Sequence, residues 1–192
     1  MSLNREEKIN HVTGFVGGCF KPFHKGHWLL VKTASAECDE VMVFVSLKDR
    51  KRDKDEHEIS GEVMSEIWER FIIPIVPSNV KVQFSEQSPV KDIYVSLALV
   101  ERSGTSNQKF VIYSDPDDMS RYTDKKLALF CPRFVREGLV STRSIPRQLT
   151  NLISGTSMRR FVQQLQIDAF IKGLPEPLQD QGKEIWGLLT TS

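Results

Sequence analysis

Apolar residues follow two kinds of pattern along this chain. Short, nearly continuous apolar runs at 40–46, 80–84 and 109–113 are typical of strands that are buried on both faces. Between them, 63–71 and 93–100 carry apolar residues every three or four positions, which predicts amphipathic helices. Because strands alternate with helices throughout, we expect an α/β fold with a doubly wound, mainly parallel sheet.

Local signals place the ends of these elements. Ser60 predicts the start of one helix, because its hydroxyl can accept a hydrogen bond from the first turn. Pro89 and Gly104 predict the start and the end of the next helix. The other elements are expected as strands at 12–19 and 139–142, and as helices at 26–36, at 123–130, around Met158, Phe161, Val162 and Leu165, and within 174–192, where a terminal helix should pack on the protein.

Length and composition bound the class of protein. The chain has 192 residues, so we expect a single domain over 1–192 with residues 1–10 disordered. Its three cysteines, Cys19, Cys38 and Cys131, show neither metal-ligand spacing nor a disulfide framework, which predicts a cytoplasmic protein. We find no apolar run of membrane length and no signal peptide, so no membrane partner is expected.

Charge is balanced overall but concentrated in one stretch. The chain has 26 lysines and arginines against 25 aspartates and glutamates, a net charge of +1, which argues against a broad nucleic-acid surface. Segment 47–58 is the most charged part and lacks an apolar period. It is therefore expected to be a mobile loop, in which Arg50 to Lys54 are solvated.

Candidate chemistry begins at the end of the first predicted strand, in the glycine-rich run from Val16 to His27. A strand that opens through a glycine-rich turn into a helix can bind phosphate, because backbone N–H groups and the positive end of the helix dipole face the anion. Gly17 and Gly18 have no Cβ, so the backbone can approach a ligand closely. His24 and His27 lie three positions apart and can point to the same side of the helix start.

The stretch 17–27, Gly-Gly-Cys-Phe-Lys-Pro-Phe-His-Lys-Gly-His, resembles the first signature of the nucleotidylyltransferase superfamily, which carries an HxGH motif. It looks most like the archaeal-type nicotinamide mononucleotide adenylyltransferases, which share Phe-x-Pro-Phe-His-x-Gly-His. A late stretch, Ile-Ser-Gly-Thr-Ser-Met-Arg at 153–159, is similar to the second signature of the superfamily. The resemblance implies a Rossmann-like fold and transfer of a nucleoside monophosphate to a phosphorylated acceptor, with release of pyrophosphate.

The resemblance also implies roles for individual residues. His24 and His27 would donate hydrogen bonds to the phosphates as negative charge builds up on them, and Arg159 would bind a phosphate through two parallel hydrogen bonds. Lys21, a departure from the family pattern, adds a positive charge beside them. The nucleotide and its phosphates would contact Gly17, Gly18, Cys19, Phe20, Gly26, Ser154, Thr156 and Ser157.

The sequence leaves alternatives for the substrates and for the roles of Lys48 and Asp115. ATP is favoured over CTP, with nicotinamide mononucleotide as acceptor and Mg²⁺ held mainly by the phosphates rather than by protein ligands. The departures at Cys19 and Lys21 keep a cytidylyltransferase, or an adenylyltransferase for another phosphorylated metabolite, as alternatives, and a catalytically silent nucleotide-binding regulator is a third. Lys48 either contacts phosphate or acceptor or is solvated, and Asp115 either contacts a ribose or forms a turn. A homo-oligomer is also possible.

Overall fold

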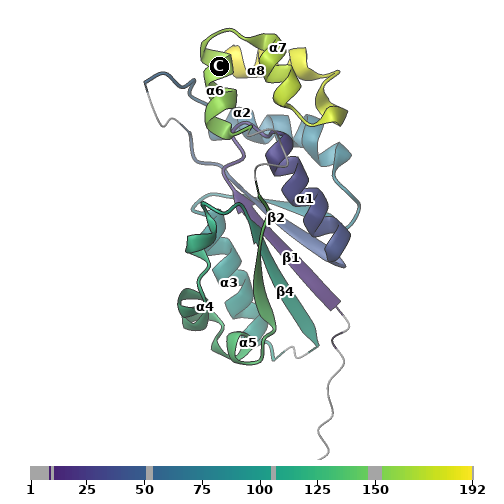
Figure 1. The fold of residues 1–192 in the computed structure, drawn as a ribbon, viewed down its shortest axis with the longest axis vertical. Helices are drawn as coiled ribbons and strands as arrows, with labels where there is room; N and C mark the ends of the chain where they lie inside the picture. The colour runs from purple at the N-terminus through teal and green to yellow at the C-terminus, as the bar shows by residue number, and fades with distance from the viewer. Residues whose placement is uncertain (1–8, 10, 51–53, 105–106, 147–152, 192) are drawn as a thin grey trace, which may run out of the picture.

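Five parallel strands form the centre of the protein. The computed structural model describes residues 9, 11–50, 54–104, 107–146 and 153–191. The strands are β1 (His11–Gly18), β2 (Glu40–Ser46), β3 (Val80–Ser85), β4 (Gln108–Ser114) and β5 (Val140–Ser144). Their order is β3-β2-β1-β4-β5, so the chain starts in the middle of the sheet and winds outward to both edges (Figure 1). The predicted doubly wound α/β fold is therefore confirmed.

Helices cover both faces of the sheet and one end of it. Helix α1 lies on one face and α3, α4 and α5 on the other, whereas α6, α7 and α8 gather with α2 beyond the carboxyl ends of the strands (Figure 1). Their bounds are α1 (Lys25–Glu37), α2 (Gly61–Ile67), α3 (Pro89–Arg102), α4 (Asp124–Phe130), α5 (Pro132–Arg136), α6 (Gly155–Gln163), α7 (Ile167–Gly173) and α8 (Gly182–Thr190). A π-helical turn at Trp68–Ile72 and 3₁₀ turns at Ile73–Ile75, Met119–Arg121 and Glu176–Leu178 complete the described helical segments.

Two apolar cores lie on opposite faces of the sheet. Neighbouring residues of a strand point to opposite faces, and on β1 Phe15 belongs to one core and Val16 to the other. The core of Val16 also contains Val31 of α1, Met158 of α6 and Phe170 of α7. Helix α6, which carries the second motif, is thus packed in the same core as the strand that leads into the first.

Capping residues fix several helix starts as predicted. The Ser60 hydroxyl accepts a hydrogen bond from the N–H of Val63 at 3.1 Å, and the Thr123 hydroxyl accepts one from Lys126 at 3.4 Å. Pro89 begins α3, and Gly104, with a φ of 78°, follows its end. These bounds agree with the sequence prediction because each rests on a local interaction.

The C-terminal region differs from the prediction. Helix α6 ends at Gln163, and Leu165, expected on that helix, has a φ of 55° and is 77% exposed. Helix α7 was not predicted, and the terminal helix occupies only Gly182–Thr190 because a proline-containing 3₁₀ turn precedes it. The short helix α5 was also missed. The expected disorder of residues 1–10 falls, apart from Ile9, outside the described residues.

Candidate active site

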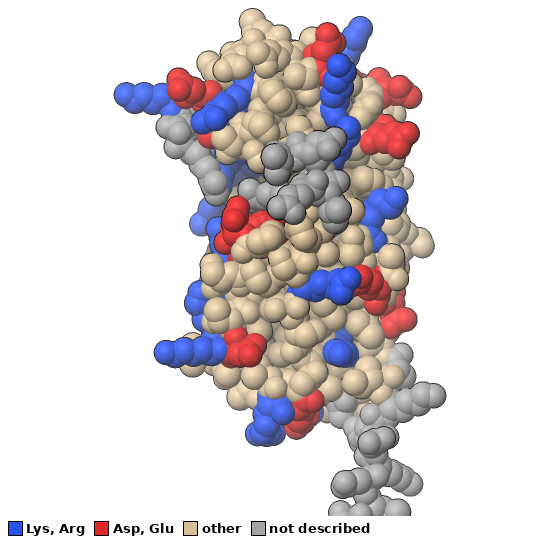
Figure 2. All heavy atoms as spheres, in the orientation of Figure 1, with Lys and Arg blue, Asp and Glu red and all other residues tan. Residues whose placement is uncertain are grey.

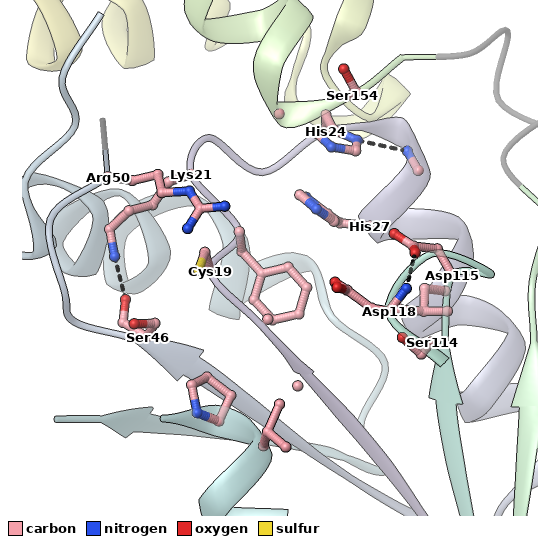
Figure 3. A pocket seen from close by; sticks show the side chains of 18 of the residues that line it. Cys19, Lys21, His24, His27, Ser46, Arg50, Ser114, Asp115, Asp118 and Ser154 are labelled. Carbon is pink, nitrogen blue, oxygen red and sulfur yellow. Dashed lines mark hydrogen bonds between the residues drawn. The ribbon is translucent and has the colours of Figure 1, made fainter. Parts of the chain in front are cut away.

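A cavity of about 480 Å³ lies at the carboxyl ends of the central strands (Figure 3). Its lining comes from the loop after β1, the ends of β2 and β4, the start of α3 and the start of α6. This is where strand order reverses, next to β1, and ligands of doubly wound sheets bind at such switch points. The cavity therefore brings together the two motifs that lie at opposite ends of the sequence.

The histidine pair lies at the start of α1. His24 is the N-cap, and its Nδ1 accepts a hydrogen bond from the N–H of Gly26 at 3.1 Å. A neutral imidazole with Nδ1 as acceptor carries its hydrogen on Nε2. The rings of His24 and His27 stack with centroids 3.6 Å apart, and both line the cavity (Figure 3). The cap therefore selects the tautomer in which His24 Nε2 is a hydrogen-bond donor.

The glycines before this pair are needed for packing within the protein. A Cβ on Gly17 would lie 2.9 Å from Cδ1 of Ile93, and one on Gly18 would lie 2.9 Å from the ring of Phe20. Both glycines, Phe20 and Gly26 line the cavity. The sequence predicts these glycines because a ligand must approach the backbone closely. The structure adds a second reason, because neighbouring side chains already fill the space that Cβ atoms would need.

Lys21 is a buried lysine in the wall of the cavity. Its side chain is 1% exposed, and Nζ donates a hydrogen bond to the carbonyl oxygen of Ser46 at the end of β2 (Figure 3). Burial lowers its pKa from 10.5 to about 8, although the nearby Cys19 and Asp49 favour the charged form. Lys21 is thus a cation at neutral pH that loses its proton in the mildly alkaline range.

The second motif begins with a capping box. The Ser154 hydroxyl accepts from the N–H of Ser157 at 3.1 Å, and the Ser157 hydroxyl accepts from the N–H of Ser154 at 2.9 Å. Ser154 and Thr156 line the cavity, but the lining residues do not include Ser157. The expected phosphate contact of Ser157 is therefore not favoured by its position, because its polar atoms complete the cap.

Arg159 also makes strong contacts inside the protein. It is 3% exposed, and its Nε and Nη2 both lie 2.6 Å from Oε2 of Glu56. Nη1 donates to the carbonyl oxygen of Lys21 at 2.7 Å, and Nη2 donates to the Thr156 hydroxyl at 3.2 Å. Arg159 lines the cavity and at the same time ties the loop after β1 to α6 and to the segment that contains Glu56.

The charged segment 47–58 is more ordered than predicted at its described ends. Lys48, Asp49 and Arg50 line the cavity, and Arg50 forms an antiparallel bridge with Ile59 through backbone hydrogen bonds of 2.9 and 3.2 Å. Arg50, expected to be solvated, is half-buried and lines the cavity, whereas Lys54 is exposed as expected. The side chain of Lys48 is exposed at the cavity. Residues 51–53 of the stretch expected to be solvated fall outside the described residues.

Asp115 forms a turn at the edge of the cavity. Its Oδ1 accepts a hydrogen bond from the N–H of Asp118 at 3.0 Å, and both carboxylates line the cavity (Figure 3). A turn and a ligand contact, the two alternatives for Asp115, are therefore compatible. Sequence reasoning missed several lining residues at or just after the carboxyl ends of strands β2 to β5, although the switch-point rule points to such positions: Ser46, Gln87, Ser88, Ser114, Arg121 and Ile145.

Three features of the described part of the chain bear on the metals, membranes and nucleic acids that it could bind. It contains no group of three or more His, Cys, Asp or Glu side chains placed to hold a metal ion. Among the same residues, no helix combines the length and the apolar composition that a membrane crossing requires. On the face shown in Figure 2, positive and negative side chains are interspersed rather than gathered by sign.

Comparison with known proteins places the chain in a family. A model described as cytidylyltransferase-like matches residues 15–188. A Vibrio parahaemolyticus protein described as a nicotinate-nucleotide adenylyltransferase superposes with a TM-score of 0.56 at 15% identity, covering 91% of this chain and 99% of that one. Plasmodium falciparum nicotinic acid mononucleotide adenylyltransferase, solved with NaAD, gives 0.57 at 16% identity, with 95% and 99% covered.

These likenesses, at 15% and 16% identity, show a shared fold. No curated protein matches the sequence. The family model, in contrast, spans most of the chain, from Phe15 in β1 to Leu188 in α8. The chain therefore belongs to the cytidylyltransferase-like family, within the nucleotidylyltransferase superfamily that its two motifs predict.

Proposed function

We propose that this protein transfers AMP from ATP to a phosphorylated acceptor such as nicotinamide mononucleotide and releases pyrophosphate. Membership of the cytidylyltransferase-like family supports a nucleotidyltransferase. The observation that carries the proposal is the single cavity lined by His24 and His27 from the first motif and by Ser154, Thr156 and Arg159 from the second. One triphosphate in this cavity can reach both motifs.

The chemistry needs no covalent enzyme intermediate. An oxygen of the acceptor phosphate forms a bond to the α-phosphorus, the bond from that phosphorus to the α,β-bridging oxygen breaks, and the electron pair leaves with pyrophosphate. Charge builds up on the phosphate oxygens during this step, so fixed hydrogen-bond donors accelerate it. His24, whose Nδ1 is occupied by the helix cap, donates through Nε2, and His27 stacked on it donates beside it.

The start of α6 is the proposed site of the β- and γ-phosphates. The first N–H groups of a helix lack partners within the helix and carry a partial positive charge. Ser154 and Thr156 hold hydroxyls at this end of the cavity, and Arg159 Nη1 lies beside Gly155, since a Cβ there would be 3.0 Å from it. These groups would bind the leaving pyrophosphate.

The acceptor phosphate is assigned to the end of β2. Lys21, Lys48 and Arg50 place three cations along this wall of the cavity, with Asp49 as the nearby anion. A phosphorylated acceptor would be attracted there and its oxygen held near the α-phosphorus. The opposite wall, with Asp115 and Asp118, offers carboxylates for the hydroxyls of a ribose.

Magnesium fits this cavity as a companion of the triphosphate. Mg²⁺ is commonly held by one or two carboxylates together with substrate phosphates and water. No group of three potential metal ligands occurs among the described residues, so the phosphates and water would supply most of the ligands of the ion. When bound with the triphosphate, the ion would neutralise charge on the departing pyrophosphate.

CTP and other acceptors remain as second candidates. The description of the matching family as cytidylyltransferase-like favours CTP, whereas the two solved adenylyltransferases act in nicotinate-nucleotide chemistry and favour ATP. A catalytically silent regulator is the third reading. It is disfavoured by the presence of both histidines in the cavity.

A pyrophosphate-release assay tests the proposal. Each of the four ribonucleoside triphosphates is offered with nicotinamide mononucleotide, nicotinate mononucleotide and other phosphorylated metabolites, with Mg²⁺ present and absent. We expect release with ATP and a mononucleotide acceptor, dependent on Mg²⁺. Turnover with CTP alone would replace ATP by CTP, and no turnover with any pair would overturn the enzymatic proposal.

A further inference from the structure

Glu56 is a buried carboxylate that the catalytic scheme does not use. It lies in the charged segment after β2, is 3% exposed, and contacts Arg159 through Oε2. Acidic side chains are almost never fully buried unless they are paired. A buried ion pair is weak evidence for stability, but the partner in this pair, Arg159, lines the cavity, which points to a role in the site.

The segment around Glu56 is held in place on both sides. The Arg50–Ile59 bridge closes it at its base. The Nε2 of His57 donates to the carbonyl oxygen of Leu189 in α8 at 2.5 Å, and the His57 N–H donates to the carbonyl oxygen of Arg159 at 3.4 Å. The carboxylate of Glu56 is therefore presented to Arg159 by an anchored backbone.

This contact fixes how the guanidinium lies between the two motifs, since Nη2 also donates to the Thr156 hydroxyl at 3.2 Å. Glu56 engages Nε and Nη2, and the opposite nitrogen, Nη1, lies 2.7 Å from the carbonyl oxygen of Lys21. Nη1 also lies close to Gly155 at the start of α6. A guanidinium is planar, so it cannot turn Nη1 away from the junction of the two motifs without breaking its contacts with Glu56.

We propose that Glu56 is a positioning residue for nucleotidyl transfer, which orients Arg159 so that Nη1 faces the phosphates where the two motifs meet. This inference rests on the function proposed above. Glu56 also balances the charge of Arg159, so the pair contributes orientation more than net attraction for the triphosphate. Loss of the carboxylate should therefore reduce turnover without weakening nucleotide binding.

The test compares Glu56→Gln with Asp55→Asn in the full chain. Asp55 is the exposed neighbour of Glu56, so its variant removes the same charge from the same segment. Three quantities are measured: kcat per folded site, the Kd of a non-hydrolysable ATP analogue, and the NMR signal of the Arg159 Nε–H with its exchange rate. For Glu56→Gln we expect faster Nε–H exchange, a fall in kcat on the order of tenfold, and a Kd that is no weaker, whereas Asp55→Asn should match the wild type.

The outcomes separate the two proposals. An unchanged Nε–H signal in Glu56→Gln, or a kcat per folded site equal to that of Asp55→Asn, would overturn the positioning role. If the wild type turned over no substrate pair, the proposed function would fail. The positioning role would then stand if the ATP analogue shifted the Arg159 Nε–H signal in the wild type but not in Glu56→Gln, and it would fall if both proteins gave the same result. If Glu56→Gln does not fold, Glu56→Asp replaces it, because aspartate keeps the negative charge but moves the carboxylate away from Arg159. Glu56→Asp should then lower kcat, whereas Asp55→Asn should not.

Discussion

The two motifs that meet in the cavity use their polar side chains in different ways. In the first motif, the imidazoles of His24 and His27 stack on each other in the cavity wall. In the second, Ser157 completes the cap of α6, and Arg159 is paired with Glu56. We propose from this contrast that the first motif supplies hydrogen-bond donors for the reaction, whereas the second forms a rigid edge of the cavity that presents the start of α6 and the Arg159 guanidinium.

The largest effect is expected in the first motif. Replacing His24 or His27 by alanine should lower kcat by about a thousandfold, since each removes a donor aimed at developing charge, while nucleotide affinity changes only a few-fold. Pyrophosphate release and nucleotide titration measure the two quantities, with His11→Ala at the other end of β1 as control. Equal modest losses in turnover and affinity would favour a nucleotide sensor.

The second motif should show its largest effect in stability. Arg159→Ala leaves Glu56 buried without its charged partner, so we expect a loss of about 3 kcal/mol in the free energy of unfolding. Arg160→Ala is the matched control, because Arg160 is the exposed neighbour and should change stability by under about 0.5 kcal/mol. Urea unfolding measures both variants. Similar effects of the two would refute the structural part of the contrast.

A smaller effect is expected for the capping box. Ser157→Ala should cost about 1 kcal/mol of stability, because it removes half of the reciprocal cap, and leave kcat nearly unchanged. Thr156→Ala is the comparison, since Thr156 lines the cavity and should lower activity. Thermal unfolding and pyrophosphate release separate the two. A strong loss of activity in Ser157→Ala with unchanged stability would return Ser157 to the phosphate ligands.

The remaining predicted effect is the pH dependence of stability that Lys21 causes. Because its pKa falls from 10.5 in the unfolded chain to about 8 in the folded protein, the unfolded state binds more protons between these values. The Lys21 contribution to the free energy of unfolding therefore rises with pH across this window, and below about pH 8 the cost of burying the charge is fully present. Urea unfolding from pH 7 to 10 should show this rise in the wild type and lose it in Lys21→Met. An identical slope in both would contradict the burial of a charged Lys21.

The fold and the two motifs could be predicted from local sequence signals, but the residues that pack behind the site, such as Glu56, could not. Buried apolar runs located β2 and β4, and Ser60 and Pro89 marked helix starts. Glu56 was missed because it stands in a charge run, and its burial is decided by Arg159, a residue distant in sequence.

Two further misses have the same physical origin. The position of Arg50 depends on a backbone bridge with Ile59 that the pattern of apolar residues does not predict. At Gly17 a side chain is excluded partly because Ile93 of α3 fills the space. In each case a tertiary contact, rather than the local sequence, determines where the residue lies.

A crystal structure with a non-hydrolysable ATP analogue tests the central claim most directly. We predict one triphosphate that spans the cavity, with its α-phosphate within hydrogen-bond reach of His24 Nε2 and its terminal phosphates at the N–H groups that begin α6. A nucleotide that contacts only one of the two motifs, or that binds outside this cavity, would contradict the account.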